Sequence, residues 1–143
     1  MPEVLVARSC DATAGLDAGA LLAADPDVTA VLCGNDEVAM GVISGLEDAG
    51  VRVPADVSVA GFDDHPLAQV WRPGLTTARQ DFPDLGRRAL ALLLTRAGGD
   101  LRAVASSTRP PVVLRGSTAA PPAAPRVRSR PATAAADAPR PAR

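Results

Sequence analysis

Residues 29–62, TAVLCGNDEVAMGVISGLEDAGVRVPADVSVAGF, decide the fold. The run opens with an apolar segment at 30–33 and closes with another at 57–62, and both have the length and continuity of strands buried on two faces. Between them, apolar residues recur at helical spacing and form one stripe, made of Ala39, Val42, Ile43 and Leu46. Asn35 or Asp36 can cap this helix. The stretch therefore predicts a strand, a helix and a second strand.

The same alternation continues on both sides of this stretch. An apolar run at 3–7 predicts an earlier strand, followed by a helix with Leu16, Ala20 and Ala24 on one face. Residues 75–80 predict an extended segment or edge strand, and 112–114 predict a last strand. The helix expected after Asp81 would bury one face, made of Phe82, Leu85, Ala89, Leu92 and Leu93. This order predicts an α/β fold, a parallel, doubly wound sheet with helices on both faces.

Composition limits the possible functions. The chain has 143 residues, 47% of them hydrophobic but only 2% aromatic, which suits one domain with an aliphatic core. The net charge is only -1, so the chain as a whole has no positive charge that would attract nucleic acid or anionic lipid. The sequence contains no glycine-rich phosphate loop, no metal-binding spacing and no run of about 18 apolar residues, so we expect no cofactor, no metal and no membrane span. The Pro-, Ala- and Arg-rich residues 119–143 predict a disordered tail.

Polar residues follow three of the apolar runs, where a doubly wound sheet binds its ligands. These residues are Arg8, Ser9, Cys10, Asn35, Asp36, Asp63, Asp64 and His65. Carboxylate and carboxamide groups exchange hydrogen bonds with hydroxyls. We therefore predict that this sheet edge binds a neutral, polyhydroxylated ligand.

Each of these residues also has a purely structural interpretation. Asn35 or Asp36 can simply cap the helix, and the two adjacent aspartates can form no more than a turn. His65 could be a catalytic base, but no Ser or Cys nucleophile with a recognisable motif accompanies it. A position in a surface turn is therefore the better interpretation of His65. The case for Cys33 as a nucleophile is weaker still, because this residue ends a buried strand. Trp71 is either core or an anchor in an interface with a partner.

The order of several motifs resembles a known family. GNDEVAMG, GVRVPADVSVAGFDD, PGLTTARQDFPDLGRRA and PPVVLRGSTAAPP follow one another as in the C-terminal part of the effector-binding region of LacI/GalR-type bacterial transcriptional regulators. The resemblance covers about 28–118 and extends more loosely from Val4. It implies a periplasmic-binding-protein-like sensor for a sugar or related metabolite, in a regulator that dimerises and reads DNA through a separate head.

The resemblance also implies roles for particular residues. The Asn of the ND pair, here Asn35, and the first Asp after the Gly-Phe pair, here Asp63, are common effector contacts in the family. Cys10 stands where the family often has an aromatic residue that stacks on the sugar, so the stacking face is lost. Phe82 corresponds to a residue near the pocket.

Two further positions correspond to family surfaces that pair the sensor subdomains. These are Met40, near the start of the helix after the ND pair, and Trp71, at the end of the loop after the 57–62 strand. The resemblance therefore predicts a homodimer, or pairing with a related regulator chain.

We accordingly expect residues 1–118 to be part of an effector sensor and residues 119–143 to be a tail. We expect a truncated cytoplasmic regulator that is not an enzyme and that lacks the helix-turn-helix head, so that it meets DNA only through a head supplied elsewhere. The alternative is a stand-alone sugar-binding or interaction module that pairs with other regulator chains.

Overall fold

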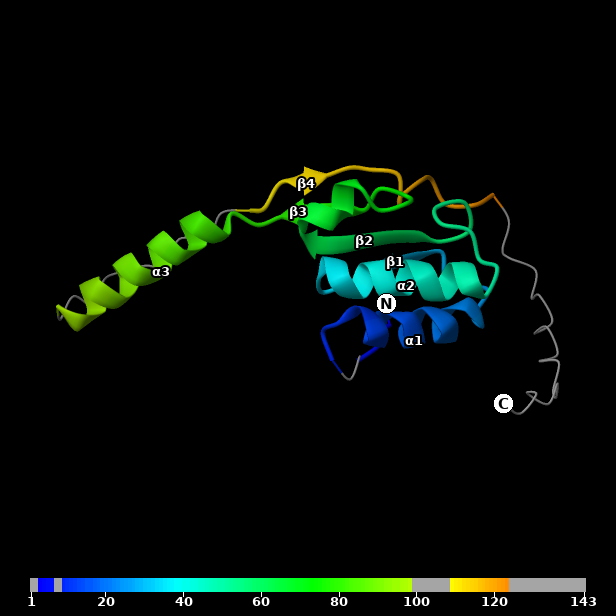
Figure 1. Ribbon diagram of the computed structural model, residues 1–143, viewed down its shortest axis with the longest axis horizontal. Helices are drawn as coiled ribbons and strands as arrows, with labels where there is room; N and C mark the ends of the chain where they lie inside the picture. The colour runs from blue at the N-terminus through cyan, green and yellow to red at the C-terminus, as the bar shows by residue number, and fades with distance from the viewer. Residues whose placement is uncertain (1–2, 7–8, 99–108, 124–143) are drawn as a thin grey trace, which may run out of the picture.

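The computed structural model describes residues 3–6, 9–98 and 109–123. It contains three α-helices, α1 (Ala12–Ala23), α2 (Asp36–Asp48) and α3 (Phe82–Ala97), and a short 3-10 helix, η1 (Pro66–Gln69). The four strands are β1 (Ala30–Leu32), β2 (Ser58–Asp63), β3 (Thr76–Arg79) and β4 (Val112–Val113). Figure 1 shows α1 and α2 stacked on one side of the sheet, while α3 extends away from it. The predicted α/β class is confirmed.

The sheet has the order β1-β2-β3-β4. β1, β2 and β3 are parallel, as predicted, whereas β4 pairs antiparallel with β3. Ser117 ties the sheet to the segment that follows β4, because its buried hydroxyl donates to the Val59 carbonyl at 2.6 Å and accepts from the Thr76 amide at 2.8 Å. The chain stays ordered against β2 as far as Ala119, whose amide donates to the Ser58 hydroxyl.

The core lies between α2 and the sheet. The predicted stripe of α2 is confirmed, since Ala39, Val42, Ile43 and Leu46 are all buried. Val57 and Val59 from the β2 region and Leu75 from the start of β3 complete this aliphatic layer. The core therefore holds β2, β3 and the first turn of α2 in fixed relative positions.

Several predicted features differ from the structure. β1 is not buried on both faces, since Ala30 and Leu32 are exposed, and the predicted apolar face of α1 is exposed as well. Residues 3–6 form no strand and their apolar side chains are exposed, because a strand needs a neighbour for its backbone groups and the sheet of the described residues ends at β1. Residue 7 of that expected strand lies outside the described residues.

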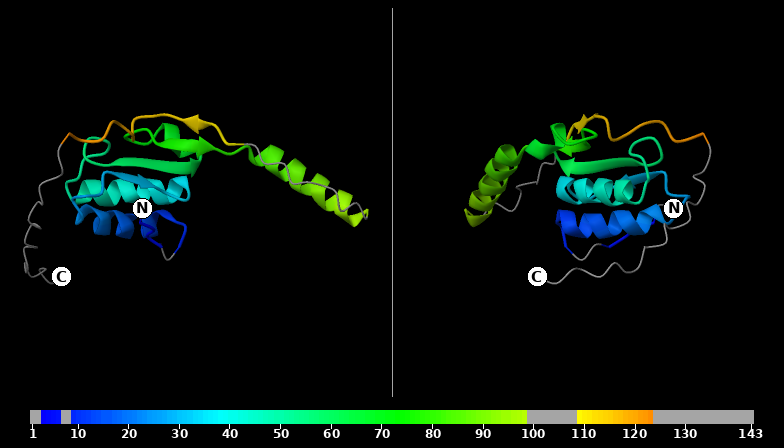
Figure 2. Two further views of the ribbon diagram at one scale, coloured as in Figure 1. Left: turned by 180° about the vertical axis from the view of Figure 1, so that it is seen from behind. Right: turned by 45° about the vertical axis from the view of Figure 1, so that its right-hand side comes forward.

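The predicted core face of α3 is also wrong. Asp81 caps the helix as expected, accepting from the Asp84 amide at 2.8 Å, but no α3 residue is buried. Phe82 is 56% exposed and Leu93 is 66% exposed, and Leu85 is exposed as well. Both views in Figure 2 show the helix projecting beyond the sheet, so it does not cover the second face as predicted. The spacing of its apolar residues specified a helix but not a packing partner.

Residues 124–143 of the predicted tail lie outside the described residues, and residues 119–123 contain no helix or strand.

α1 packs on α2 through glycines. Gly15 and Gly19 of α1 approach Gly41 and Gly45 of α2 so closely that a Cβ on any of them would overlap backbone atoms of the facing helix. The two helix backbones therefore touch, and α1 is held as a second layer beneath α2.

We expect Gly41→Ala to lower the free energy of unfolding by about 1 to 3 kcal/mol, because the new methyl group overlaps the Ala12 carbonyl and the helices must separate. Gly86→Ala in α3 is the matched control, since its Cβ would meet open space and alanine favours the helix by about 0.8 to 1 kcal/mol. Urea unfolding followed by circular dichroism measures both. Equal stability of the two variants would contradict the close packing.

Candidate functional site

A cavity of about 420 Å³ lies at the carboxyl ends of β1, β2 and β3. Its position follows from the parallel arrangement of these strands, whose ends meet at one edge of the sheet. The cavity is lined by Asn35, Asp36, Glu37, Asp63, Asp64, His65, Pro66, Arg79, Gln80 and Phe82. Three of the four predicted ligand contacts, Asn35, Asp63 and Phe82, therefore share one cavity.

Asn35 serves as the N-cap of α2. Its side-chain oxygen accepts from the Val38 amide at 2.8 Å, and its amide nitrogen donates to the Cys10 carbonyl at 2.9 Å. The capping interpretation is thus confirmed. A carboxamide has further donor and acceptor capacity, which leaves one N–H and one lone pair of Asn35 for a ligand.

Asp36 lines the cavity but is only 1% exposed. One carboxylate oxygen accepts from the Thr77 hydroxyl and the other from the His65 amide, each at 2.6 Å. Both oxygens are thus committed to internal donors, as a buried charge requires. Asp36 also stands in the first turn of α2, where the helix dipole favours negative charge.

Asp63, the last residue of β2, and Asp64 after it have left-handed backbone conformations, with φ of 109° and 59°. Such angles cost free energy for residues other than glycine and are tolerated best by Asn and Asp. These angles agree with the turn interpretation of the pair.

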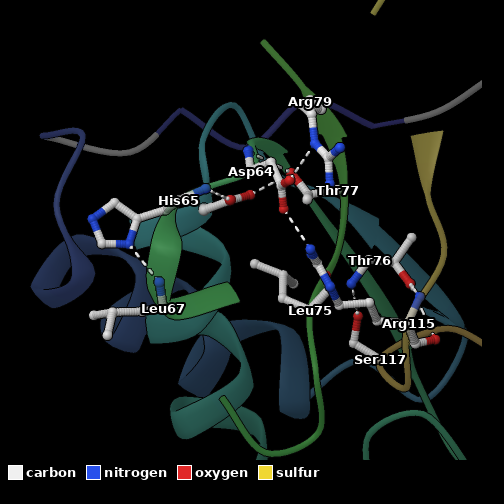
Figure 3. Close-up of polar contacts among 10 residues, drawn as sticks. Asp64, His65, Leu67, Leu75, Thr76, Thr77, Arg79, Arg115 and Ser117 are labelled. Carbon is white, nitrogen blue, oxygen red and sulfur yellow. Dashed lines mark hydrogen bonds and ion pairs between the residues drawn. The ribbon is translucent and has the colours of Figure 1, made fainter. Parts of the chain in front are cut away.

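Asp64 is bound by two arginines (Figure 3). Its oxygens accept from Arg115 and from Arg79, each at 2.6 Å, and Arg115 also donates to the Leu75 carbonyl. Burial alone would raise the pKa of Asp64, but the hydrogen bonds from Arg115 and Arg79 outweigh it and hold the pKa below the ordinary value of 3.8. Asp64 therefore acts as a structural anion.

Asp63 is the uncommitted carboxylate of the site. It is half-buried, and no other side chain of the described residues donates a hydrogen bond to it. Partial burial and the nearby charge of Asp36 raise the pKa of Asp63, while His65 acts in the opposite direction. A carboxylate with free acceptor positions beside a cavity can accept two or more hydrogen bonds from a ligand.

His65 caps η1 through its side chain, as Nδ1 accepts from the Leu67 amide at 3.1 Å (Figure 3). This contact agrees with the predicted turn role. Cys33 is buried, and burial together with the charge of Asp36 raises the pKa of its thiol to about 12, so the thiol stays protonated.

The other predicted site residues lie outside the cavity. Cys10 is exposed and touches the site through its backbone carbonyl alone. Met40 is 4% exposed and packs in the core, so its side chain offers almost no surface to a partner. Trp71 is half-buried and packs against that core. Arg8 lies outside the described residues.

Arg79 and Gln80 line the cavity but were absent from the sequence prediction. They follow β3, so the rule that gathered the residues after the other strands applies to them equally. They were missed because residues 75–80 lacked the continuous apolar character of a central parallel strand. Glu37, in the first turn of α2, was likewise missed.

Within the described part of the chain, no group of three or more His, Cys, Asp or Glu side chains is placed to hold a metal ion. No described helix has the length and apolar character needed to span a membrane.

The model of the periplasmic binding protein-like domain matches residues 4–118. The chain belongs to this family. It is 41% identical over 128 residues to the transcriptional regulator MalR of Streptomyces coelicolor, covering 89% of this chain and 36% of that protein. The chain thus spans little more than a third of this relative.

Solved structures of the periplasmic binding protein-like family agree. A LacI-family regulator from Arthrobacter, in complex with lactose, superposes with a TM-score of 0.66 at 34% identity, covering 80% of this chain and 45% of that one. The Lac repressor bound to ONPG superposes with a TM-score of 0.69 at 32% identity, covering 77% and 34%. The resemblance to LacI-type regulators is confirmed, and these relatives are regulators rather than enzymes, as the sequence predicts.

We expect Asp64→Asn to lower the free energy of unfolding by about 1.5 to 3 kcal/mol at neutral pH, because two charge-assisted hydrogen bonds lose their acceptor charge. Asparagine tolerates the left-handed backbone, so the substitution isolates the charge. The folded-state pKa of Asp64 is depressed, so its contribution is present above the ordinary value of 3.8 and is lost as the pH falls through the folded pKa.

The difference in unfolding free energy between wild type and Asp64→Asn should therefore shrink below pH about 4. Urea unfolding across the pH range measures it, with Asp48→Asn, at the exposed end of α2, as control. A difference independent of pH would contradict the ion pairs.

Proposed function

We propose that the residues lining the cavity form one side of an effector site, and that the chain is the sensing part of a LacI-type transcriptional regulator. The observation that carries this proposal is the cavity itself, where the uncommitted Asp63, the remaining polar capacity of Asn35 and the exposed ring of Phe82 meet. A ring of this kind offers an apolar face to a sugar, while the polar groups bind its hydroxyls. Cys10 contributes at most its backbone.

The charges around the cavity favour a neutral ligand. Asp36, Glu37, Asp63 and Asp64 all line it, and the one arginine in the lining, Arg79, is already bound to Asp64. A phosphate group would approach more carboxylate than free cation. The relative from Arthrobacter holds lactose, and a neutral sugar of this size is the effector class that we propose here.

Ligand binding would act on transcription by favouring one arrangement of the sensor, which in such regulators is coupled to the spacing of two DNA-reading heads. DNA contact belongs to a head domain and not to the described residues, and the site of action is the cytoplasm. We further propose that residues 1–118 form the sensor part and 119–143 a tail outside it.

A second candidate function is an interaction module that pairs with other regulator chains. The exposed apolar residues of α3 favour it, because an amphipathic helix gains little stability by itself when its apolar side chains stay exposed.

Asp63→Asn tests the ligand contact. We expect it to weaken the binding of lactose, or of another neutral sugar found to bind, by about 10- to 100-fold, as the loss of hydrogen bonds to a charged acceptor predicts. Isothermal titration calorimetry or ligand-observed NMR at millimolar sugar measures it, and Asp48→Asn is the matched control. Unchanged affinity in Asp63→Asn would remove this residue from the site, and no binding of any neutral sugar by the wild type would refute the proposed effector class.

The proposed homodimer places the exposed part of Trp71 and its neighbours in η1 at the subunit contact. Trp71→Ala also removes packing against the core, so Leu67→Asp, at an exposed position of η1, is the cleaner variant. We expect self-association of the wild type at micromolar concentration, weakened at least about tenfold by Leu67→Asp. Sedimentation velocity measures it, with Leu21→Asp on exposed α1 as control. A monomeric wild type would exclude the dimer.

A further inference from the structure

Asp36 connects three elements of the site. It begins α2, its carboxylate accepts from the Thr77 hydroxyl on β3, and it accepts from the His65 amide in the turn after β2. These donors come from chain positions 41 and 29 residues away. One buried side chain therefore links the turn after β2 and the strand β3 to the start of α2.

The carboxylate of Asp36 packs closely against β2. Gly61 of β2 lies so close that a Cβ there would overlap the Asp36 carboxylate oxygen, and Leu75 and the Asp36 backbone close the same space. A glycine at this position lets the carboxylate approach the strand backbone directly. The side chain is thus confined between the strand and its two donors.

The turn that Asp36 holds is the one that carries Asp63. Asp63 and Asp64 adopt left-handed angles that are costly for non-glycine residues, and such conformations persist where the surroundings enforce them. The turn is anchored by the His65 amide on Asp36, by the Asp64 amide on the Thr77 hydroxyl at 3.3 Å, and by the Asp64 ion pairs. The carboxylate of Asp63 has no such anchor of its own, so its direction depends on this turn.

We propose that Asp36 is a positioning residue: it holds the Asp63–His65 turn in the conformation that presents Asp63 to the effector, without binding the effector itself. This inference rests on the proposed function of the cavity. Both Asp36 oxygens are occupied by internal donors and the side chain is 1% exposed, so it has little to offer a ligand directly. Its influence reaches the ligand through the backbone of the turn.

The decisive comparison is between Asp36→Ala and Asp36→Asn. Alanine leaves the His65 amide and the Thr77 hydroxyl without an acceptor. Asparagine can still accept from the His65 amide, because the Thr77 hydroxyl can reverse and accept from the asparagine N–H. If Asp36 acted through its charge or as a ligand contact, both variants would lose affinity for the effector. A positioning role predicts instead that Asp36→Asn keeps the affinity that Asp36→Ala loses.

The first readout is amide hydrogen exchange of the full chain without ligand, taken as the rate at His65 relative to that at Val59. The Val59 amide donates to the Ser117 carbonyl at 2.8 Å in the core, so it reports general destabilisation. We expect the ratio to rise at least about tenfold in Asp36→Ala and to stay within about threefold of wild type in Asp36→Asn.

The second readout is the affinity for lactose, or for the neutral sugar that the wild type binds. We expect Asp36→Ala to weaken it at least about tenfold and Asp36→Asn to keep most of it. If Asp36→Ala does not fold, Thr77→Val and Thr77→Ser replace it, because valine removes the hydroxyl that holds the carboxylate and serine keeps it. The serine variant should then retain the affinity that the valine variant loses.

An unchanged exchange ratio in a folded Asp36→Ala or Thr77→Val variant would overturn the inference, as would equal loss of affinity in Asp36→Asn and Asp36→Ala. If the wild type binds no neutral sugar, the proposed effector class fails, and the exchange ratio still decides whether Asp36 holds the turn.

Discussion

The buried carboxylate of Asp36 is the contact on which the rest of the site depends. An ionised group removed from water costs several kcal/mol unless hydrogen bonds replace its solvent. Here a hydroxyl from β3 and an amide from the turn after β2 take that role, and the dipole of α2 adds to it. The requirement to satisfy one charge therefore joins three segments that are distant in the sequence.

The four carboxylates around the cavity have different tasks because their surroundings differ. Asp36 has internal donors for both oxygens, and Asp64 is neutralised by Arg79 and Arg115. In the described part of the chain, Asp63 has neither kind of partner, and Glu37 is exposed. Two of these carboxylates are held by internal partners and, within the described residues, two are not, a difference that a count of acidic residues would not reveal.

The layers of the fold are stabilised by different means. α2 is joined to the sheet by an aliphatic core, and α1 is joined to α2 by direct backbone contact at four glycines. α3 has neither kind of contact with the other described elements, and its apolar side chains remain exposed. The cavity therefore lies where the well-packed body meets the beginning of an unsupported helix, and Phe82 belongs to both.

The sequence alone determined most of the local structure. The stripe of α2, the caps at Asn35 and Asp81, and the apolar runs that become β1 and β2 depend on neighbouring residues, so periodicity and capping chemistry predict them. The gathering of Asn35 and Asp63 at one edge also followed, because parallel strands place their carboxyl ends together. The family resemblance rested on the order of motifs within the same stretch.

Only the tertiary structure decided which groups are free to bind. Asp63 and Asp64 are adjacent and chemically identical, yet Arg115, 51 residues further along the chain, binds one and leaves the other open. Likewise, the spacing in α3 and the apolar run at 3–6 specified surfaces to be buried but not what would bury them. Burial and charge pairing depend on distant segments, and a local pattern carries no information about which distant segment arrives.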